Sequence, residues 1–394
     1  MKLSSRVQAV KPSPTLAITA RAAELRAAGK DVIGLGAGEP DFDTPEHIKE
    51  AARKAIADGK TKYTPVDGTP GLKQAVIAKF KRDNGIDYRP EQILVSCGGK
   101  QSFYNLAQAI LDPGDEVIIP APYWVSYPDM SILAGGEPVL VHAGADQHFK
   151  ITPAQLRGAL TAKTRLVVIN SPSNPTGMAY TADELAALGE VLREYPKVAI
   201  ASDDMYEHIR WNLDVPFVNI LSVCPDLADR TLVLNGVSKA YSMTGWRIGY
   251  AGGPADIIKA MKKIQSQSTS NPTSISQYAA EAALNGPQDC IGEMLVQFRK
   301  RHDYVVERLN GIAGIECLPT DGTFYVFPSV KGMIDTMPDI HDDLQLAEHL
   351  IVNAGVALVP GAAFGLGGHA RISIATSMQN LEQALDRIER VAGG

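Results

Sequence analysis

Short apolar runs rich in valine and isoleucine recur between residues 92 and 236, and they constrain the fold more than any other feature of the sequence. They are QILVS (92–96), EVIIP (116–120), RLVVIN (165–170), KVAIAS (197–202) and TLVLNG (231–236). Their hydrophobicity is nearly continuous rather than alternating, which is typical of strands in a parallel sheet that is covered on both faces. Because helical patterns such as 102–111 and 181–195 lie between these runs, the sequence predicts an α/β fold.

The pattern changes after about residue 290, which indicates a second, smaller α+β domain. This part is predicted to hold a long polar helix (291–310), a strand pair (315–320 and 322–328), a helix near 343–355, and a last strand (370–375) before a terminal helix. We expect residues 1–45 to form an N-terminal arm and part of the small domain, residues 46–290 the large domain, and residues 291–394 the small C-terminal domain.

Charge and composition exclude several classes of protein. The chain has 38 Lys and Arg against 44 Asp and Glu, without long charged blocks, so no basic face for nucleic acid or a membrane is expected. No apolar run approaches the ~18 residues that a membrane span needs, and the N-terminus lacks a signal-peptide core. The four cysteines have no CxxC spacing, so neither a disulfide framework nor a metal site is expected, and reduced thiols in a cytoplasmic protein are the simplest interpretation.

A dinucleotide site is not expected, although VIGLGAGEP (32–40) begins like its glycine fingerprint. That fingerprint must open a helix, whereas Pro40 and Pro45 favour extended chain here.

The residues that follow the predicted strands form a coherent set. In doubly wound sheets, ligands bind beyond the carboxyl ends of the strands. These ends carry an anion-binding glycine turn before a helix, an aromatic ring, an amide, a carboxylate with a phenol, and a lysine: Gly99 with Lys100, Trp124, Asn174, Asp203 with Tyr206, and Lys239. Pyridoxal 5'-phosphate needs all of these groups at once, because it requires a lysine for its Schiff base, a carboxylate for its ring nitrogen, hydrogen bonds, a stacking group and phosphate donors.

Longer motifs in the same order resemble the class I aminotransferases of fold type I, and in particular the bacterial Iβ branch of aspartate aminotransferases. They are KPSPTLAIT, AGEPDFDTP, KYTPVDGTPGLKQA, SPSNPTG, SDDMYEH, NGVSKAYSMTGWRIGY, FYVF and RISIATS. The resemblance runs along the whole chain. It implies a large domain with a mostly parallel seven-stranded sheet covered by helices, a smaller α+β domain, and a cytoplasmic homodimer with shared active sites.

The resemblance also implies roles in cofactor binding. Lys239 would form the Schiff base, Arg247 would clamp the phosphate, and Asp203 would pair with the ring nitrogen. Asn174 and Tyr206 would bond the phenolate oxygen.

Further roles follow from the same motifs. Trp124 would stack on the cofactor ring, while Gly99 and Lys100 would begin the phosphate-cradling helix. Tyr63 would reach the phosphate of the neighbouring subunit. Many relatives carry a hydroxyl residue three positions before the lysine, where this chain has Gly236, and Ser238 is the candidate substitute.

For the substrate, the resemblance implies that Arg371 grips the α-carboxylate and that Gly38 closes over it through its backbone. Trp124 and Asn174 would also contact the substrate. Lys100 and Lys11 would receive a distal carboxylate, which favours aspartate and glutamate.

The expected reaction is ping-pong transamination of aspartate and glutamate with 2-oxoglutarate and oxaloacetate, and amination of prephenate to arogenate stays open as a further activity. Two alternatives keep the cofactor: an aromatic aminotransferase, and a β- or γ-lyase on the same fold. A regulator with an aminotransferase-like domain is a third alternative, but it needs a DNA-binding domain, for which the roughly 30 residues before AGEP leave no room.

Overall fold

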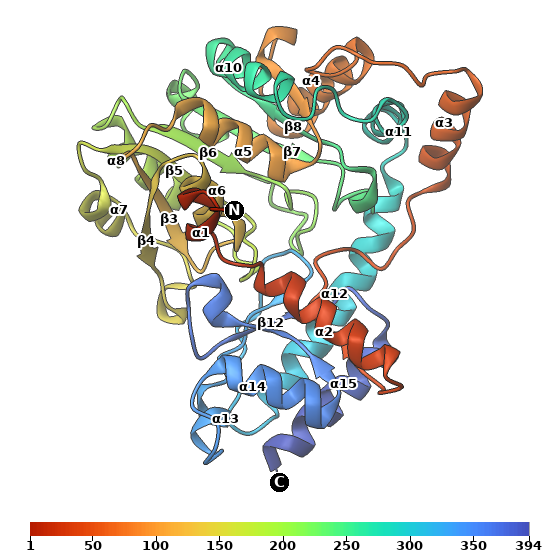
Figure 1. Cartoon of the computed structure of the whole chain (residues 1–394), viewed down its shortest axis with the longest axis vertical. Helices are drawn as coiled ribbons and strands as arrows, with labels where there is room; N and C mark the ends of the chain where they lie inside the picture. The colour runs from red at the N-terminus through yellow and green to blue at the C-terminus, as the bar shows by residue number, and fades with distance from the viewer. Residues whose placement is uncertain (394) are drawn as a thin grey trace.

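A seven-stranded sheet forms the centre of the larger part of the molecule in the computed structural model, which describes residues 1–393 (Figure 1). Its order is β2-β8-β7-β6-β5-β3-β4. The strands are β2 (Ile93–Ser96), β3 (Glu116–Ala121), β4 (Glu137–His142), β5 (Thr164–Asn170), β6 (Ala199–Asp203), β7 (Thr231–Gly236) and β8 (Gly249–Gly252). The pairs between β7 and β4 are parallel, whereas β8 runs antiparallel to both β2 and β7. The predicted mostly parallel seven-stranded sheet is therefore confirmed.

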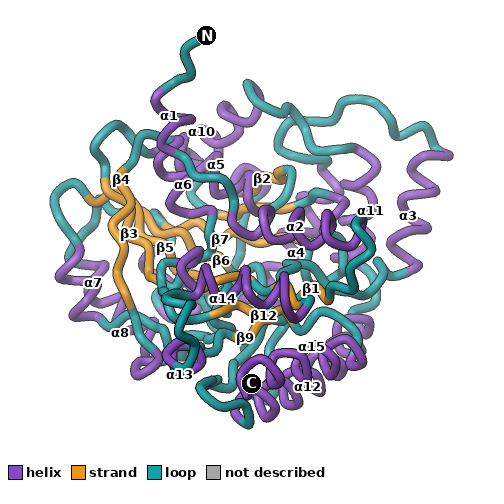
Figure 2. The backbone as a smooth tube through the Cα atoms, turned by 60° about the horizontal axis from the view of Figure 1, so that its bottom comes forward, coloured by secondary structure: helices purple, strands orange, loops and turns teal. Residues whose placement is uncertain are grey.

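Helices cover both faces of this sheet, and further helices pack in the smaller part of the molecule (Figures 1 and 2). They are α1 (Ser5–Ala9), α2 (Pro14–Ala27), α3 (Glu46–Ala57), α4 (Pro70–Asn84), α5 (Gly99–Ile110), α6 (Ser126–Leu133), α7 (Pro153–Ala159), α8 (Ala182–Arg193), α9 (Ile220–Val223), α10 (Ala255–Ser266), α11 (Ser274–Asn285), α12 (Asp289–Asn310), α13 (Lys331–Asp335), α14 (Asp343–His349) and α15 (Met378–Gly393).

The two faces of the sheet belong to two separate hydrophobic cores. Along β3, Val117 and Ile119 pack in the core that α5, α6 and α10 share, while Ile118 packs in the core that α4, α8 and α11 share. Successive side chains of a strand point to opposite faces, so a strand buried on both sides needs apolar residues at every position. This explains the unbroken apolar runs of the sequence.

The smaller part of the molecule contains a three-stranded antiparallel sheet of β11 (Val359–Pro360), β12 (Ala370–Ser373) and β9 (Tyr325–Val326). A second, two-stranded sheet pairs β1 (Ile33–Gly34) with β10 (Val356–Ala357). The N-terminal residues thus join the C-terminal part of the chain. In Figure 2, α12 and α15 lie side by side beneath these strands. The domain boundaries at residues 45 and 290 stay a prediction.

The predicted strand pair 315–320 and 322–328 is wrong in its pairing. Only Tyr325–Val326 forms a strand, and its partner is β12, while Glu316 makes an isolated bridge to Ser329. Pro319 has no N–H to donate to a ladder, and the N–H groups of Asp321 and Gly322 donate to the carbonyl of Gly177 instead. This segment is therefore a turn docked on the larger part of the molecule.

No helix within residues 1–393 combines the length and the apolar character that crossing a membrane requires.

Candidate active site

A cavity of about 270 Å³ lies at the carboxyl ends of β5, β6 and β7, next to the start of α5. Eleven of the thirteen predicted site residues line it: Gly38, Gly99, Lys100, Trp124, Asn174, Asp203, Tyr206, Ser238, Lys239, Arg247 and Arg371. Most of them follow strands of the central sheet, which brings the strand ends together, whereas Gly38 and Arg371 come from the N-terminal segment and from β12.

Lys239 lies three residues after β7, with its half-buried side chain in the cavity wall. Its Nζ donates to the carbonyl oxygen of Gly38 at 2.6 Å. Burial, together with the positive charges of Arg247 and Arg371, lowers the pKa of Lys239 to about 8. A lysine with this pKa is about one-tenth neutral at pH 7, far more than an ordinary lysine, and the neutral amine is the form that acts as a nucleophile or a base.

Asp203 and Asp204 are neighbours in the sequence but face different surroundings. Asp203 lines the cavity, where its Oδ2 accepts from the Tyr127 hydroxyl and its Oδ1 from the Met205 N–H at 3.2 Å. Asp204 accepts from Ser202 Oγ and Asn219 Nδ2, each at 2.7 Å, and burial raises its pKa to about 7. Side chains alternate along a strand, so only one of the two aspartates can face the cavity.

An anion cradle is built where β2 turns into α5. Gly98 has a φ of +93°, and a β-carbon there would lie 2.2 Å from Arg247 Nη2. The turn therefore requires glycine, and it brings the guanidinium of Arg247 against the N-terminus of α5, which is 12 residues long. Arg247 itself donates to the carbonyls of Thr244 (2.8 Å) and Cys97 (3.3 Å). Free N–H groups at a helix start beside an arginine suit a phosphate dianion.

The glycine at position 236 has a steric explanation. A β-carbon there would lie 3.0 Å from the carbonyl oxygen of Ile248 and 3.1 Å from Cα of Gly249. A hydroxyl side chain at this position would be crowded by the adjacent strand, whereas the buried Ser238 lines the cavity.

Arg371 projects from β12 into the cavity and is 2% exposed. Its Nη1 donates to Asn174 Oδ1 at 3.0 Å and its Nη2 to the carbonyl of Gly36 at 2.8 Å. The guanidinium lies 4.3 Å from the ring centroid of Tyr325 and 5.0 Å from that of Phe364. Its buried Nε has no hydrogen-bond partner in the described part of the chain.

Lys11 and Tyr63 do not line the cavity. Lys11 lies near Asp129 of α6. Burial raises the pKa of Asp129, and the positive charge of Lys11 partly offsets that rise. Tyr63 lies between α3 and α4 and is 92% exposed. Their roles stay predictions.

Several residues of the cavity wall are not predicted from the sequence. Asn170, the last residue of β5, donates to the carbonyl of Asp203 at 2.9 Å, and the strand-end rule would have found it. Tyr325 lies within the FYVF motif. Tyr127 is carried by α6, three residues after Trp124, and no motif points to it. Ser13, Thr15 and Leu16 bring the start of α2 to the same wall.

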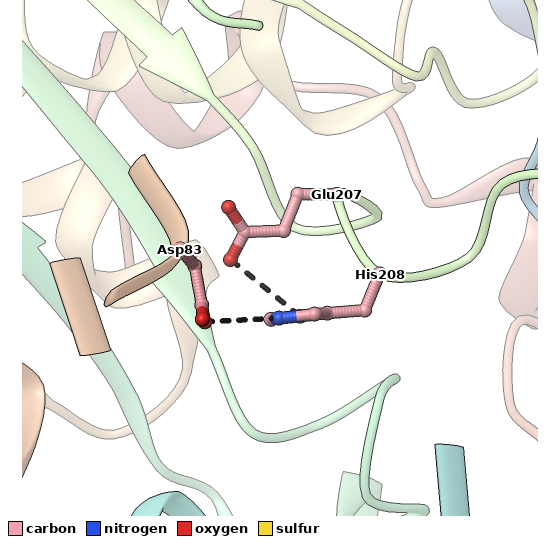
Figure 3. Close-up of side chains that lie close together, drawn as sticks. All are labelled: Asp83, Glu207 and His208. Atoms are coloured by element: carbon pink, nitrogen blue, oxygen red, sulfur yellow. Dashed lines mark hydrogen bonds and ion pairs between the residues drawn. The ribbon is translucent and has the colours of Figure 1, made fainter. Parts of the chain in front are cut away.

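Asp83, Glu207 and His208 lie close together elsewhere in the molecule (Figure 3). His208 Nε2 lies 3.1 Å from Asp83 Oδ2. The fully buried ammonium of Lys79 forms an ion pair with Glu207 and lies 3.9 Å from Asp83. Because a lysine already supplies the positive charge among these carboxylates, we interpret the cluster as a structural ion network.

Comparison with known proteins agrees with this geometry. A family model described as aminotransferase class I and II matches residues 30–388. An aspartate/prephenate aminotransferase of Nitrosomonas europaea is 60% identical over 98% of this chain and 99% of its own length. The crystal structure of an aspartate aminotransferase from Rhizobium meliloti superposes with a TM-score of 0.96 at 50% identity, covering 100% of this chain and 99% of that one. The structure of the aspartate aminotransferase from Thermus thermophilus with maleate superposes with a TM-score of 0.93 at 45% identity. The match covers 99% of this chain and 100% of that one.

The fold and the cavity define an aminotransferase of fold type I. The chain belongs to the family of class I and II aminotransferases.

Proposed function

We propose that this protein is a pyridoxal phosphate-dependent transaminase that acts on aspartate and glutamate with 2-oxoglutarate and oxaloacetate. One observation carries the proposal. A single cavity is lined by the half-buried Lys239 amine, the anion cradle, the Asp203 carboxylate and the Arg371 guanidinium. The family membership and the names of the close relatives support the same conclusion.

The residues present fit the cofactor. The α5 N-terminus with Arg247 would hold its phosphate, Asp203 its ring nitrogen, and Lys239 its aldehyde carbon. Asn174 and Tyr206 would bond its phenolate oxygen, and Trp124 would cover its ring. When bound, pyridoxal phosphate supplies an electron sink for the charge that develops when an amino acid loses its α-proton.

Lys239 is the general base of the proposed mechanism. Its Nζ lines the cavity and would take up the α-proton of a bound amino acid, because a pKa of about 8 leaves part of the amine neutral and able to act as a base. The buried Arg371 orients the amino acid by forking its α-carboxylate, and the backbone of Gly38 closes over it.

A distal carboxylate is proposed to meet Lys100, with Lys11 assisting from the N-terminal arm. The ammonium of Lys100 lies 5.2 Å from the Trp124 ring centroid, at the wall of the cavity, and burial lowers its pKa. Relatives named aspartate/prephenate aminotransferase support prephenate as a further acceptor. Because prephenate is also a dicarboxylate, the same cations would receive it.

Replacing Lys11 by alanine is expected to lower kcat/KM for aspartate about 10-fold and to leave kcat/KM for phenylalanine unchanged. Only aspartate has a second carboxylate, and this carboxylate would lose a cationic partner. Steady-state kinetics make the measurement, with 2-oxoglutarate as the acceptor for aspartate and aromatic amino acids, and oxaloacetate as the acceptor for glutamate. Prephenate is tested as the acceptor with aspartate or glutamate as the donor. Lys30→Ala is the matched control on an exposed lysine. A preference for aromatic substrates that Lys11→Ala does not change would contradict the proposed substrate class, and steady release of pyruvate or ammonia without an acceptor would favour a lyase.

The pKa of Lys239 predicts how cofactor loading depends on pH. Below about pH 8 the lysine is mostly protonated, so the rate at which the cofactor-free protein binds pyridoxal phosphate covalently should rise about tenfold per pH unit and level off above pH 8. Stopped-flow absorbance measures the rate, with Nα-acetyl-lysine as the reference for an ordinary amine. A rate that continues to climb to pH 10, as for that reference, would show that the cavity does not lower the pKa.

We also propose a cytoplasmic homodimer with shared active sites. A large aromatic side chain that is almost fully exposed, such as Tyr63, suits a contact with a second subunit. The four cysteines are unpaired, which suits a reducing compartment.

A further inference from the structure

The Asp203 carboxylate accepts a hydrogen bond from a residue that none of the sequence motifs identifies. Tyr127, in the first turn of α6, is fully buried and donates its phenolic proton to Asp203 Oδ2. The other oxygen, Oδ1, accepts from the Met205 N–H at 3.2 Å. Asp203 is the only carboxylate that lines the cavity among the described residues.

The direction of this hydrogen bond follows from its surroundings. Burial and the adjacent Asp203 charge raise the pKa of the Tyr127 phenol well above 10, so the proton stays on the tyrosine and the carboxylate is the acceptor. Burial alone raises the pKa of Asp203, and the Tyr127 hydrogen bond acts against that rise. The phenol thus favours the ionised form of Asp203.

Tyr127 is itself held in place by aromatic contacts. Its ring lies 5.2 Å from the Trp124 ring, at an interplanar angle of 90°, and 4.9 Å from the Phe103 ring. Trp124 forms part of the cavity wall. One buried side chain therefore supports both groups that the cofactor ring is expected to contact, the stacking indole and the carboxylate.

We propose that Tyr127 is a positioning residue, which orients Asp203 toward the ring nitrogen of the cofactor and keeps it in its carboxylate form. This inference rests on the proposed function, because it assigns a partner to Asp203 in that role. Two donors on two different oxygens prevent rotation of the carboxylate and leave lone pairs that face the cavity. The hydrogen bond also moderates how strongly Asp203 attracts the proton on the ring nitrogen.

The test is Tyr127→Phe, which keeps the ring and its packing and removes only the hydroxyl. A hydrogen bond to a charged group predicts about 10-fold weaker binding of pyridoxal phosphate and a fall of about 10-fold in kcat, with KM for aspartate within about 2-fold of the wild type. The midpoint of the pH titration of the bound cofactor's visible absorbance should shift as well. Tyr123→Phe, a tyrosine four residues earlier that lies outside this cavity, should change none of these values.

A double-mutant cycle with Asp203→Asn separates a positioning role from a structural one. If Tyr127 acts through Asp203, adding Tyr127→Phe to Asp203→Asn should leave cofactor affinity within about 2-fold of the Asp203→Asn value. This pair also removes the buried charge whose Oδ2 would lose its donor in Tyr127→Phe alone, so it provides a folded variant if the single one fails to fold. Additive losses in the cycle, or a Tyr127→Phe protein with wild-type affinity and titration midpoint, would overturn the inference. A wild-type protein that does not bind pyridoxal phosphate would instead contradict the proposed function.

Discussion

Lys239→Ala is expected to lower kcat for aspartate transamination by about 10⁴-fold or more, because it removes the proposed covalent attachment point and the proposed general base at once. The Lys239→Ala protein is expected to fold with a stability close to that of the wild type. Lys239 Nζ makes one hydrogen bond, to the carbonyl of Gly38, and its depressed pKa shows that the cavity does not stabilise its charge. Single-turnover measurements with aspartate give the rate, and thermal melting gives the stability.

Lys259→Ala supplies the control for this change, because Lys259 is an exposed lysine of α10. It should retain wild-type kinetics. A Lys239→Ala protein with more than about 1% of wild-type kcat would exclude Lys239 as the base, whatever the effect on cofactor binding.

Arg371→Leu is expected to lower kcat/KM for aspartate by about 10²- to 10³-fold. The change removes a buried guanidinium that would bind the α-carboxylate with two parallel hydrogen bonds, and a lysine cannot form that pair of bonds. Arg371→Lys should lose less, because it keeps the charge without the two-pronged contact. The dissociation constant of maleate, a dicarboxylate that does not react, should rise in parallel with the loss of kcat/KM.

A matched change on the surface, Arg299→Leu, tests whether loss of an arginine alone matters. Arg299 pairs with Asp303 on α12, away from the cavity, so both aspartate kinetics and maleate binding should be unchanged. If Arg371→Leu binds maleate as tightly as the wild type does, the α-carboxylate must be held elsewhere.

The fold could be predicted where burial dictates residue type. The five apolar runs became β2, β3, β5, β6 and β7 because both sides of each are covered. The sequence did not reveal β4, an edge strand that is largely exposed or half-buried, or β8, whose residues GYAG lack β-branched side chains. The pairing of Tyr325–Val326 with β12 joins residues distant in sequence, and no local pattern encodes it.

The candidate site was predictable where residues follow strands, because sheet topology alone brings those ends together. The choice of Asp203 over Asp204 required the resemblance to a family, and the structure supplies its physical reason in the alternation along β6. Tyr127 was not predictable, because a buried tyrosine on a helix is usually core and only the contact with Asp203 distinguishes it. The crowding at Gly236 likewise depends on the neighbouring strand.

If Lys239 carries pyridoxal phosphate, as proposed, an amino acid should be able to displace it from the cofactor. Borohydride reduction of the cofactor-loaded protein, followed by peptide mass spectrometry, identifies the lysine that is attached. We predict a single modified peptide that contains Lys239, and loss of the modification when aspartate is added before the reductant without an oxo acid. Modification at Lys100 or at exposed lysines, or a Lys239 adduct that aspartate cannot displace, would contradict the account.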